Sequence, residues 1–249
     1  MAATTSRILI VDDEVDTCAN LSDILGDLGY EVDTANDGLA ALELLERKHY
    51  DVALLDLRMP GMGGLELYRR IKEKSAGTVA LIVTAYASSD TAKSALAAGA
   101  RQIVSKPVNI ERLLGLIQDA IDSPLLLVVD DDCDLCDNLW EIFHERGLRV
   151  HLAHTVDEAG RILQHGPFQV VLLDMKLPGG NGHDVLKLVR ATNPQARTIV
   201  ITGYPNEMES RVQQALAEGA TSVAYKPFDV PSLLNKVTDL MQAGQGDRP

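Results

Sequence analysis

The sequence predicts an α/β protein that contains the same parallel-sheet domain twice. Short apolar runs that end at polar residues alternate with longer runs in which apolar residues recur at helical spacing. The second half of the 249-residue chain repeats this alternation. Alternating strands and helices favour a parallel sheet with helices on both faces, because each crossover helix packs back onto the sheet. We therefore expect two doubly wound (βα)5 domains.

The first half holds five expected strands and five expected helices. The strands are short, mostly apolar runs at 7–11, 31–35, 51–56, 78–84 and 102–105. The helices carry apolar residues three or four positions apart, at 16–28, 38–48, 64–74, 88–98 and 109–121. Gly29 and Gly99 end two of these helices, and Asn109 caps the last one.

The second half repeats this order. The stretch Asp51–Gly61, an apolar run that ends at a carboxylate before a Pro-Gly turn, recurs 118 residues later as Gln169–Gly179. The expected strands lie at 125–129, 148–153, 169–174, 197–202 and just before Lys226. The expected helices lie at 134–146, 156–164, 182–191, 207–218 and 230–241. Two complete copies predict two domains rather than an array of small repeats.

The two expected domains meet at a short connector. We place the first domain at residues 1–122 and the second at 123–249, with a polar tail from about residue 243. Ser123 and Pro124 join them without a Gly/Ser-rich spacer. We therefore expect a defined connection rather than a long flexible linker.

Composition argues against several classes of partner. The net charge is −13, both halves are acidic, and no run of lysine or arginine stands out. We therefore expect no direct contact with nucleic acid and none with an anionic membrane surface. Three cysteines, an odd number, predict no disulfide framework, and a reducing cytoplasm is the expected setting. Cys133 and Cys136 form a CxxC beside three aspartates, which disfavour a reactive thiolate and a redox role. Cys18 and Cys136 are equivalent in the repeat, which indicates ordinary helix packing.

Polar residues follow the expected strands at the end where ligands bind to a doubly wound sheet. They are Asp12, Asp13, Asp56, Thr84 and Lys106 in the first half, and Asp130, Asp131, Asp174, Thr202 and Lys226 in the second. Three carboxylates held together repel one another, and a hard cation such as Mg²⁺ relieves that repulsion. A carboxylate beside Mg²⁺, a hydroxyl and a lysine is placed to accept a phosphoryl group.

A simpler interpretation exists for each of these residues alone. An aspartate at a strand end is more often a turn former or a helix cap, and a Lys-Pro dipeptide by itself is a loop. All five residues, however, stand at strand ends, and all five recur in the second copy. That coincidence favours a functional constellation.

Each half resembles a receiver domain of the bacterial two-component response regulators, over about residues 6–122 and 124–242. The resemblance implies a flavodoxin-like fold with strand order 2-1-3-4-5. It also implies that Asp56 and Asp174 accept a phosphoryl group from a phosphohistidine on a histidine kinase or a phosphotransfer protein. One Mg²⁺ per domain would be the cofactor.

The resemblance also assigns roles to individual residues. The implied metal ligands are Asp12, Asp13, Asp56 and the backbone carbonyl of Arg58 in the first domain, and Asp130, Asp131, Asp174 and the backbone carbonyl of Lys176 in the second. Asp12 and Asp130 would act through metal-bound water. The implied phosphoryl-binding residues are Thr84 and Lys106 in the first domain, and Thr202 and Lys226 in the second. The bonds before Pro107 and Pro227 resemble a peptide that is usually cis in receivers.

The sequence departs from the receiver pattern at one position. Receivers often carry Tyr or Phe three residues before the lysine, where Ile103 and Val223 stand here. Tyr225 is adjacent to its lysine and would point to the opposite side of its strand. We therefore do not expect signalling through an inward-turning aromatic ring in either domain.

Three functions compete. The leading one is a response regulator of two phosphoaccepting receivers that signals through an unknown downstream protein. Self-phosphorylation and autodephosphorylation would be its only chemistry. A homodimer is a possible assembly. The alternative is the N-terminal regulatory part of a larger hybrid histidine kinase or nucleotide cyclase. A phosphohydrolase resembling the haloacid dehalogenases would need a second aspartate two residues after the first, where Arg58 and Lys176 stand.

Overall fold

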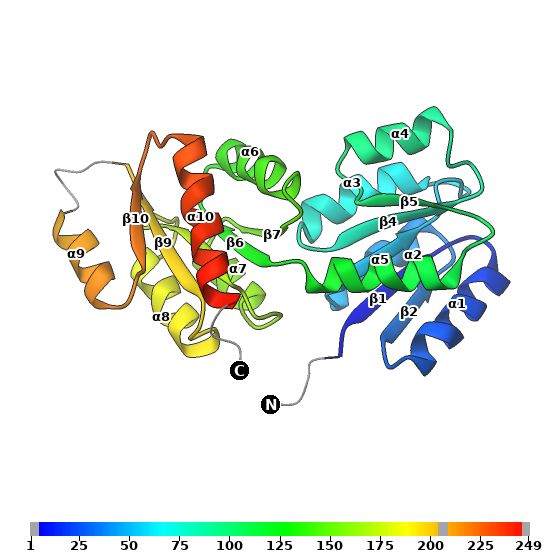
Figure 1. Cartoon of the computed structure of the whole chain (residues 1–249), viewed down its shortest axis with the longest axis horizontal. Helices are drawn as coiled ribbons and strands as arrows, with labels where there is room; N and C mark the ends of the chain where they lie inside the picture. Colours follow the sequence, from blue (N-terminus) through cyan, green and yellow to red (C-terminus); the bar gives the residue numbers. More distant parts are fainter. Residues whose placement is uncertain (1–4, 204–208, 246–249) are drawn as a thin grey trace. The chain divides into compact units, whose positions relative to one another are not determined.

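The structure, a computed structural model, describes residues 5–203 and 209–245 of the chain. The chain divides into two compact units, Met1–Ser123 (unit 1) and Pro124–Pro249 (unit 2) (Figure 1). Ser123 is tied to unit 1, because its hydroxyl donates to the carbonyl of Asp119 (2.7 Å) and accepts from the Arg101 guanidinium (2.7 Å). Both units are built around one parallel sheet.

Unit 1 contains a five-stranded sheet in the order β2-β1-β3-β4-β5, and every pairing is parallel. The strands are β1 (Arg7–Val11), β2 (Glu31–Ala35), β3 (Val52–Leu55), β4 (Val79–Thr84) and β5 (Gln102–Ser105). The helices are α1 (Val15–Asp27), α2 (Gly38–Arg47), α3 (Gly64–Lys74), α4 (Asp90–Ala97) and α5 (Ile110–Asp122). The predicted fold class and strand order are confirmed.

Unit 2 has the same topology, with the sheet order β7-β6-β8-β9-β10. Its strands are β6 (Leu125–Val129), β7 (Arg149–Ala153), β8 (Val170–Asp174), β9 (Arg197–Thr202) and β10 (Ser222–Tyr225). Its helices are α6 (Cys133–His144), α7 (Val156–Ile162), α8 (Gly182–Thr192), α9 (Glu209–Ala217) and α10 (Val230–Gln245).

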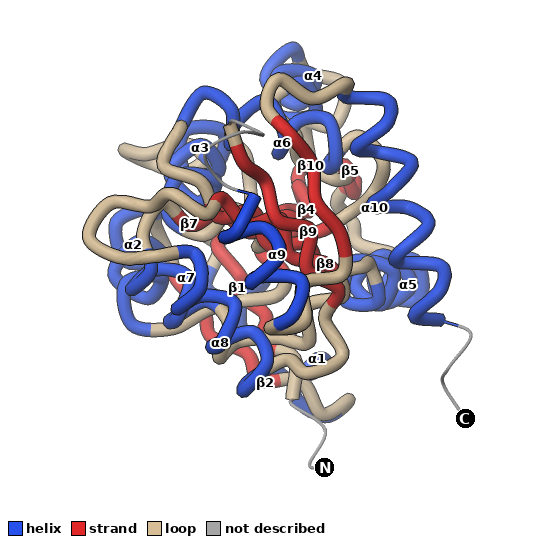
Figure 2. The backbone as a smooth tube through the Cα atoms, turned by 90° about the vertical axis from the view of Figure 1, so that its left-hand side faces the viewer, coloured by secondary structure: helices blue, strands red, loops and turns tan. Residues whose placement is uncertain are grey.

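Helices cover both faces of each sheet, and alternate strand residues point to opposite faces, so successive residues enter two different cores. In β1, Leu9 and Val11 pack in a core with α2, α3 and α4, whereas Ile8 and Ile10 pack in a second core with α1 and α5. These four side chains are at most 1% exposed. Figure 2 shows the same layers in unit 2, with α7, α8 and α9 on one side of the strands and α10 on the other.

Nearly all elements end within two residues of their predicted bounds. α4 begins later than expected because Ser89 is its N-cap, with a side chain that accepts from the N–H of Ala92. α10 continues to Gln245, so the tail predicted from about residue 243 begins as helix, and residues 246–249 lie outside the described part. The predicted start of the helix at 207 also lies outside the described residues, and α9 is described from Glu209.

The strand register brings the expected site residues to one edge of the sheet. Asp12 and Asp56 follow the paired strands β1 and β3, so they leave the sheet side by side. Lys106 follows β5 and donates its backbone N–H to the carbonyl of Thr84 at the end of β4 (3.0 Å). Within residues 5–203 and 209–245, no helix combines the length and the apolar character needed to cross a membrane.

Candidate functional site

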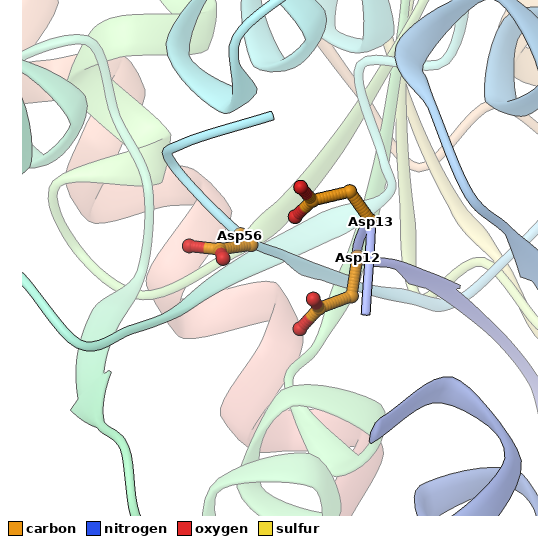
Figure 3. A group of neighbouring side chains, drawn as sticks. All are labelled: Asp12, Asp13 and Asp56. Carbon is orange, nitrogen blue, oxygen red and sulfur yellow. The ribbon is translucent and has the colours of Figure 1, made fainter. Parts of the chain in front are cut away.

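The carboxylates of Asp12, Asp13 and Asp56 form a cluster at the end of the unit 1 sheet (Figure 3). One oxygen of each lies within 4.8 Å of the others. Asp12 and Asp56 are only 3% and 8% exposed, whereas Asp13 is exposed. Two buried carboxylates beside a third one are costly to hold without cations, because each has lost its hydration.

Local structure holds Asp12 in place. Its carboxylate accepts the backbone N–H of Glu14 (3.0 Å), and its own N–H donates to the carbonyl of Ala35 on β2 (3.2 Å). The thiol of Cys18, on the buried side of α1, donates to the Asp12 carbonyl (3.4 Å). The first turn of α1 therefore packs directly beneath this carboxylate.

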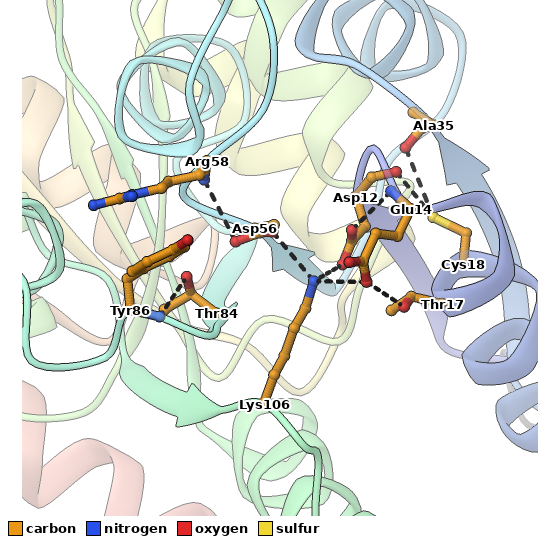
Figure 4. Close-up of polar contacts among 10 residues, drawn as sticks. All are labelled: Asp12, Glu14, Thr17, Cys18, Ala35, Asp56, Arg58, Thr84, Tyr86 and Lys106. Carbon is orange, nitrogen blue, oxygen red and sulfur yellow. Dashed lines mark hydrogen bonds and ion pairs between the residues drawn. The ribbon is translucent and has the colours of Figure 1, made fainter.

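Lys106 supplies the cation of unit 1 (Figure 4). Its Nζ lies 2.6 Å from Asp12 Oδ2 and 3.1 Å from Asp56 Oδ2. Burial acts to lower the pKa of Lys106, but hydrogen bonds to both aspartates outweigh it, so the pKa is raised. Burial also raises the pKa of Asp12, more than the lysine lowers it. The carboxylates are therefore only partly compensated by Lys106, and a further cation would be favoured.

Thr84 and two neighbouring side chains border the cluster. Thr84 is fully buried, and its hydroxyl accepts the backbone N–H of Tyr86 (3.2 Å). The guanidinium of Arg58 lies 3.5 Å from the centre of the Tyr86 ring, a cation–π contact (Figure 4). The backbone N–H of Arg58 points to Asp56 Oδ1 (3.4 Å). The chain segments after β3 and β4 therefore meet above the expected phosphoacceptor.

Unit 2 repeats the cluster with Asp130, Asp131 and Asp174, again within 4.8 Å of one another. Nζ of Lys226 lies 2.6 Å from Asp130 Oδ2 and 2.8 Å from Asp174 Oδ2. Burial raises the pKa of Asp130, as it does in unit 1. The buried hydroxyl of Thr202 has no hydrogen-bond partner among the described residues. A buried hydroxyl of this kind is able to bind an added oxygen.

The donor set fits Mg²⁺ in both units. It consists of carboxylate oxygens, which are the ligands that this hard cation prefers. The exposed member, Asp13 in unit 1 and Asp131 in unit 2, leaves each cluster open to solvent. A buried carboxylate with a raised pKa, as found for Asp12 and Asp130, is stabilised by such a cation.

Glycines make room behind Asp56 and Asp174, the expected phosphoacceptors. Gly64 and Gly182 begin α3 and α8, and a Cβ on either would collide with the backbone carbonyl of Asp56 or Asp174. Only a residue without a side chain lets these helices approach the strand ends so closely.

The structure brings together the carboxylates, threonines and lysines that the sequence predicts. The Lys106–Pro107 and Lys226–Pro227 bonds are cis, as the resemblance implied. The backbone carbonyls of Arg58 and Lys176 have no contact that establishes them as ligands, so that role stays a prediction. Tyr225 is 46% exposed, and its expected direction relative to Lys226 stays a prediction.

Two features of the site escape sequence reasoning. The contact between Arg58 and Tyr86 joins two loops, so no local pattern reveals it. Glu14, whose carboxylate reaches within 3.6 Å of Lys106 Nζ, looks in the sequence like one more acid after Asp12 and Asp13. The sequence sets Glu14 apart in one way: at the equivalent position of unit 2 stands the shorter Asp132.

Two of the three cysteines, Cys18 and Cys136, have the predicted packing role. Cys18 and Cys136 are buried at equivalent places, and the thiol of Cys136 donates to the Asp130 carbonyl (3.4 Å). Cys133 is exposed, and its sulfur lies 4.0 Å from Nδ1 of His154. All three thiols are free.

Comparison with known proteins agrees with this geometry. The family model of the response regulator receiver domain matches the chain twice, at residues 8–118 and 126–238. A response regulator receiver protein of Anaeromyxobacter sp. (strain Fw109-5) is 36% identical over 234 residues, which are 94% of this chain and 94% of that protein. The transcriptional regulatory protein ZraR of Klebsiella oxytoca is 40% identical over 114 residues, 46% of this chain and 26% of that protein.

Among solved structures, the response regulator protein TrrA of Thermotoga maritima, in complex with Mg²⁺-BeF, is similar to this chain. It is 34% identical with a TM-score of 0.43, over 47% of this chain and 99% of that one. The chain thus spans nearly all of the Anaeromyxobacter protein but about a quarter of ZraR. The two family matches cover both sheets and both acidic clusters. The chain therefore belongs to the response regulator receiver family and contains one receiver domain in each unit.

Proposed function

We propose that both receiver domains accept a phosphoryl group, on Asp56 in unit 1 and on Asp174 in unit 2. The observation that carries the proposal is the same in both units. A carboxylate at a strand end lies within 3.1 Å of a lysine amine, beside two further aspartates and a buried threonine. Because this set occurs twice with the same geometry, we assign the same chemistry to both copies.

The proposed donor is a phosphohistidine on a histidine kinase or a phosphotransfer protein. A carboxylate oxygen of Asp56 attacks the phosphorus atom, and a new O–P bond forms while the P–N bond breaks. The leaving imidazole nitrogen keeps the electron pair of that bond and takes a proton from solvent. The product is an aspartyl phosphate, which hydrolysis by water returns to the carboxylate.

Lys106 and Thr84 would stabilise the transferred group in unit 1. The ammonium of Lys106 already faces Asp56, so it can pair with a phosphoryl oxygen with a small movement. The hydroxyl of Thr84 lies at the adjacent strand end and can donate to a second oxygen. Lys226 and Thr202 would do the same in unit 2, where the hydroxyl has no described partner to give up.

The carboxylates of Asp12, Asp13 and Asp56 would hold Mg²⁺ in unit 1, and those of Asp130, Asp131 and Asp174 would hold it in unit 2. The proposed ligands include the backbone carbonyls of Arg58 and Lys176. When bound, the metal supplies positive charge that offsets the charge on the transferring oxygens. Asp12 and Asp130 are buried and hydrogen-bonded to their lysines, so they also keep those lysines charged and oriented.

The test is intact-mass measurement after incubation with a small acyl-phosphate donor and Mg²⁺. The native chain should gain two phosphoryl groups, and Asp56→Asn and Asp174→Asn should each gain one. The double variant should gain none, which controls for modification elsewhere. A native chain without any adduct, under conditions in which circular dichroism shows it folded, would overturn the proposal.

The proposed downstream partner of both receivers is a protein. We propose that phosphorylation changes contacts with a downstream protein. Light scattering would test whether it also produces a homodimer. The cytoplasm is the proposed compartment, since all three cysteines are free thiols. The alternative, a regulatory part of a hybrid kinase or nucleotide cyclase, has no separate support in the described residues.

A further inference from the structure

Glu14 occupies an unusual position in unit 1. It is the N-cap residue of α1, yet its side chain makes no cap hydrogen bond. Its carboxylate points instead to Lys106, with Oε2 3.6 Å from Nζ (Figure 4). The hydroxyl of Thr17 donates to the same oxygen (2.9 Å) and holds it there. Lys106 therefore faces three carboxylates: its ammonium lies 2.6 Å from Asp12 and 3.1 Å from Asp56, and it forms a longer ion pair with Glu14.

Unit 2 lacks this arrangement. At the position of Glu14 stands Asp132, whose shorter side chain caps α6 by accepting the N–H of Leu135 (3.0 Å). At the position of Thr17 stands Leu135, which has no hydroxyl. Within the described residues, Lys226 has ion pairs with Asp130 and Asp174 alone. The two receivers thus differ by one carboxylate at the lysine that would bind the phosphoryl group.

We propose that Glu14, held by Thr17, is a positioning residue that competes with the phosphoryl group on Asp56 for Lys106. The inference rests on the proposed function of Asp56 as phosphoacceptor. A phosphoryl group brings close to two negative charges and strong acceptor oxygens to the site. When Lys106 pairs with them, its ammonium moves away from the carboxylates that now surround it, including that of Glu14. Glu14 draws the ammonium away from the phosphoryl oxygens, so it weakens retention of that group.

The expected size of the effect follows from exposure. The side chain of Lys106 is 15% exposed, but that of Glu14 is 66% exposed, so water screens much of their interaction. Exposed ion pairs contribute little free energy. Loss of this one should therefore change the affinity of unit 1 for a phosphoryl mimic only about two- to fivefold. Unit 1 should therefore bind a phosphoryl group or its mimic about two- to fivefold more weakly than it would without the charge of Glu14.

The first experiment measures the affinity of unit 1 for fluoroberyllate with Mg²⁺, by ¹⁹F NMR titration of the full chain carrying Asp174→Asn. Glu14→Gln should bind the mimic about two- to fivefold more tightly. Thr17→Val, which releases the carboxylate but keeps its charge, should shift the affinity in the same direction by less. Glu43→Gln removes an equal charge from an exposed position on α2, on the other face of the sheet, and should change nothing.

A double-mutant cycle shows whether Glu14 acts through the lysine. In a chain that carries Lys106→Met, Glu14→Gln should no longer tighten binding, because the contested cation is gone. A gain that persists without the lysine would mean that Glu14 acts by its charge alone and would overturn the proposal. An unchanged or weaker affinity of Glu14→Gln in the native background would overturn it as well.

The second experiment transfers the arrangement to unit 2, in a chain carrying Asp56→Asn. Asp132→Glu with Leu135→Thr should weaken binding of the mimic about two- to fivefold, whereas Leu135→Thr alone should not. Fluorescence of the buried Trp140 on α6 reports whether the variant helix is intact. An intact double variant with native affinity contradicts the proposal. Failure of the native chain to bind the mimic at either aspartate would instead overturn the proposed function, and this inference with it.

Discussion

Replacement of Gly182 by alanine should destabilise unit 2 and displace Asp174, its proposed phosphoacceptor. Gly182 is the first residue of α8, and a Cβ there would lie 2.7 Å from the carbonyl oxygen of Asp174 and 2.7 Å from Cα of Met175. Both neighbours are backbone atoms, so no side chain can rotate away. The first turn of α8 or the end of β8 has to move.

The cost can be worked from this geometry. Inserting a methyl group into a well-packed contact costs about 1–3 kcal/mol. Unfolding of a domain of this size in urea has a slope of about 2 kcal/mol per M, so the midpoint should fall by about 0.5–1.5 M. Trp140 is the single tryptophan of the chain and is buried in unit 2, stacked on His144 (ring centroids 4.3 Å apart). Its fluorescence therefore follows unfolding of unit 2.

Gly160→Ala is the matched control. Gly160 lies inside α7, and its Cβ would meet only a methyl carbon of Leu188 at 3.5 Å, an ordinary contact. Helix propensity then favours alanine by up to about 1 kcal/mol, so this variant should unfold at a higher urea concentration. If Gly182→Ala unfolds at or above the native midpoint while retaining its affinity for fluoroberyllate, the argument from close backbone approach is wrong.

Three further predictions concern the site. Lys226→Met should stay folded but unfold at lower urea without Mg²⁺, because two buried aspartates lose their cation. If Mg²⁺ stabilises neither the variant nor the native chain against urea, the metal site is refuted. Cys133 should react first with a thiol reagent at pH 8, since it is exposed. Burial raises the pKa of Cys136 to about 12, which leaves a thiolate fraction of about 10⁻⁴ at that pH. Rapid labelling of two thiols in the folded protein would contradict this prediction. Burial raises the pKa of Asp12 and Asp130, which follow β1 and β6, so both keep a proton to a higher pH than in the unfolded chain. As the pH is lowered, the affinity for Mg²⁺ measured by calorimetry should therefore begin to fall at a higher pH than for an ordinary aspartate. An affinity that does not change between pH 7 and 4.5 would contradict this prediction.

Much of the fold follows from local pattern. Continuous apolar runs such as 8–11 and 52–55 predict strands buried on both faces, and those strands are 0–1% exposed. The positions of Asp12 and Asp56 follow in turn, because parallel strands place their carboxyl ends at one edge. Element ends were less accurate, since α4 begins at its Ser89 cap and α10 runs on to Gln245. The strand order came from the resemblance, not from the pattern of apolar residues.

The sequence by itself determined the two α/β domains, their repeat and the residue types at the strand ends, because periodicity and short-range turn chemistry encode these directly. Only the tertiary structure decided which partners those residues take. Lys106 contacts Asp12, Asp56 and Glu14 at once, and Arg58 stacks on Tyr86, through contacts between residues far apart in the chain. Such contacts depend on the register of β1, β3, β4 and β5 and on side-chain reach. For the same reason two acids that look alike in the sequence, Glu14 and Asp132, act differently, since one reaches a lysine and the other caps its own helix.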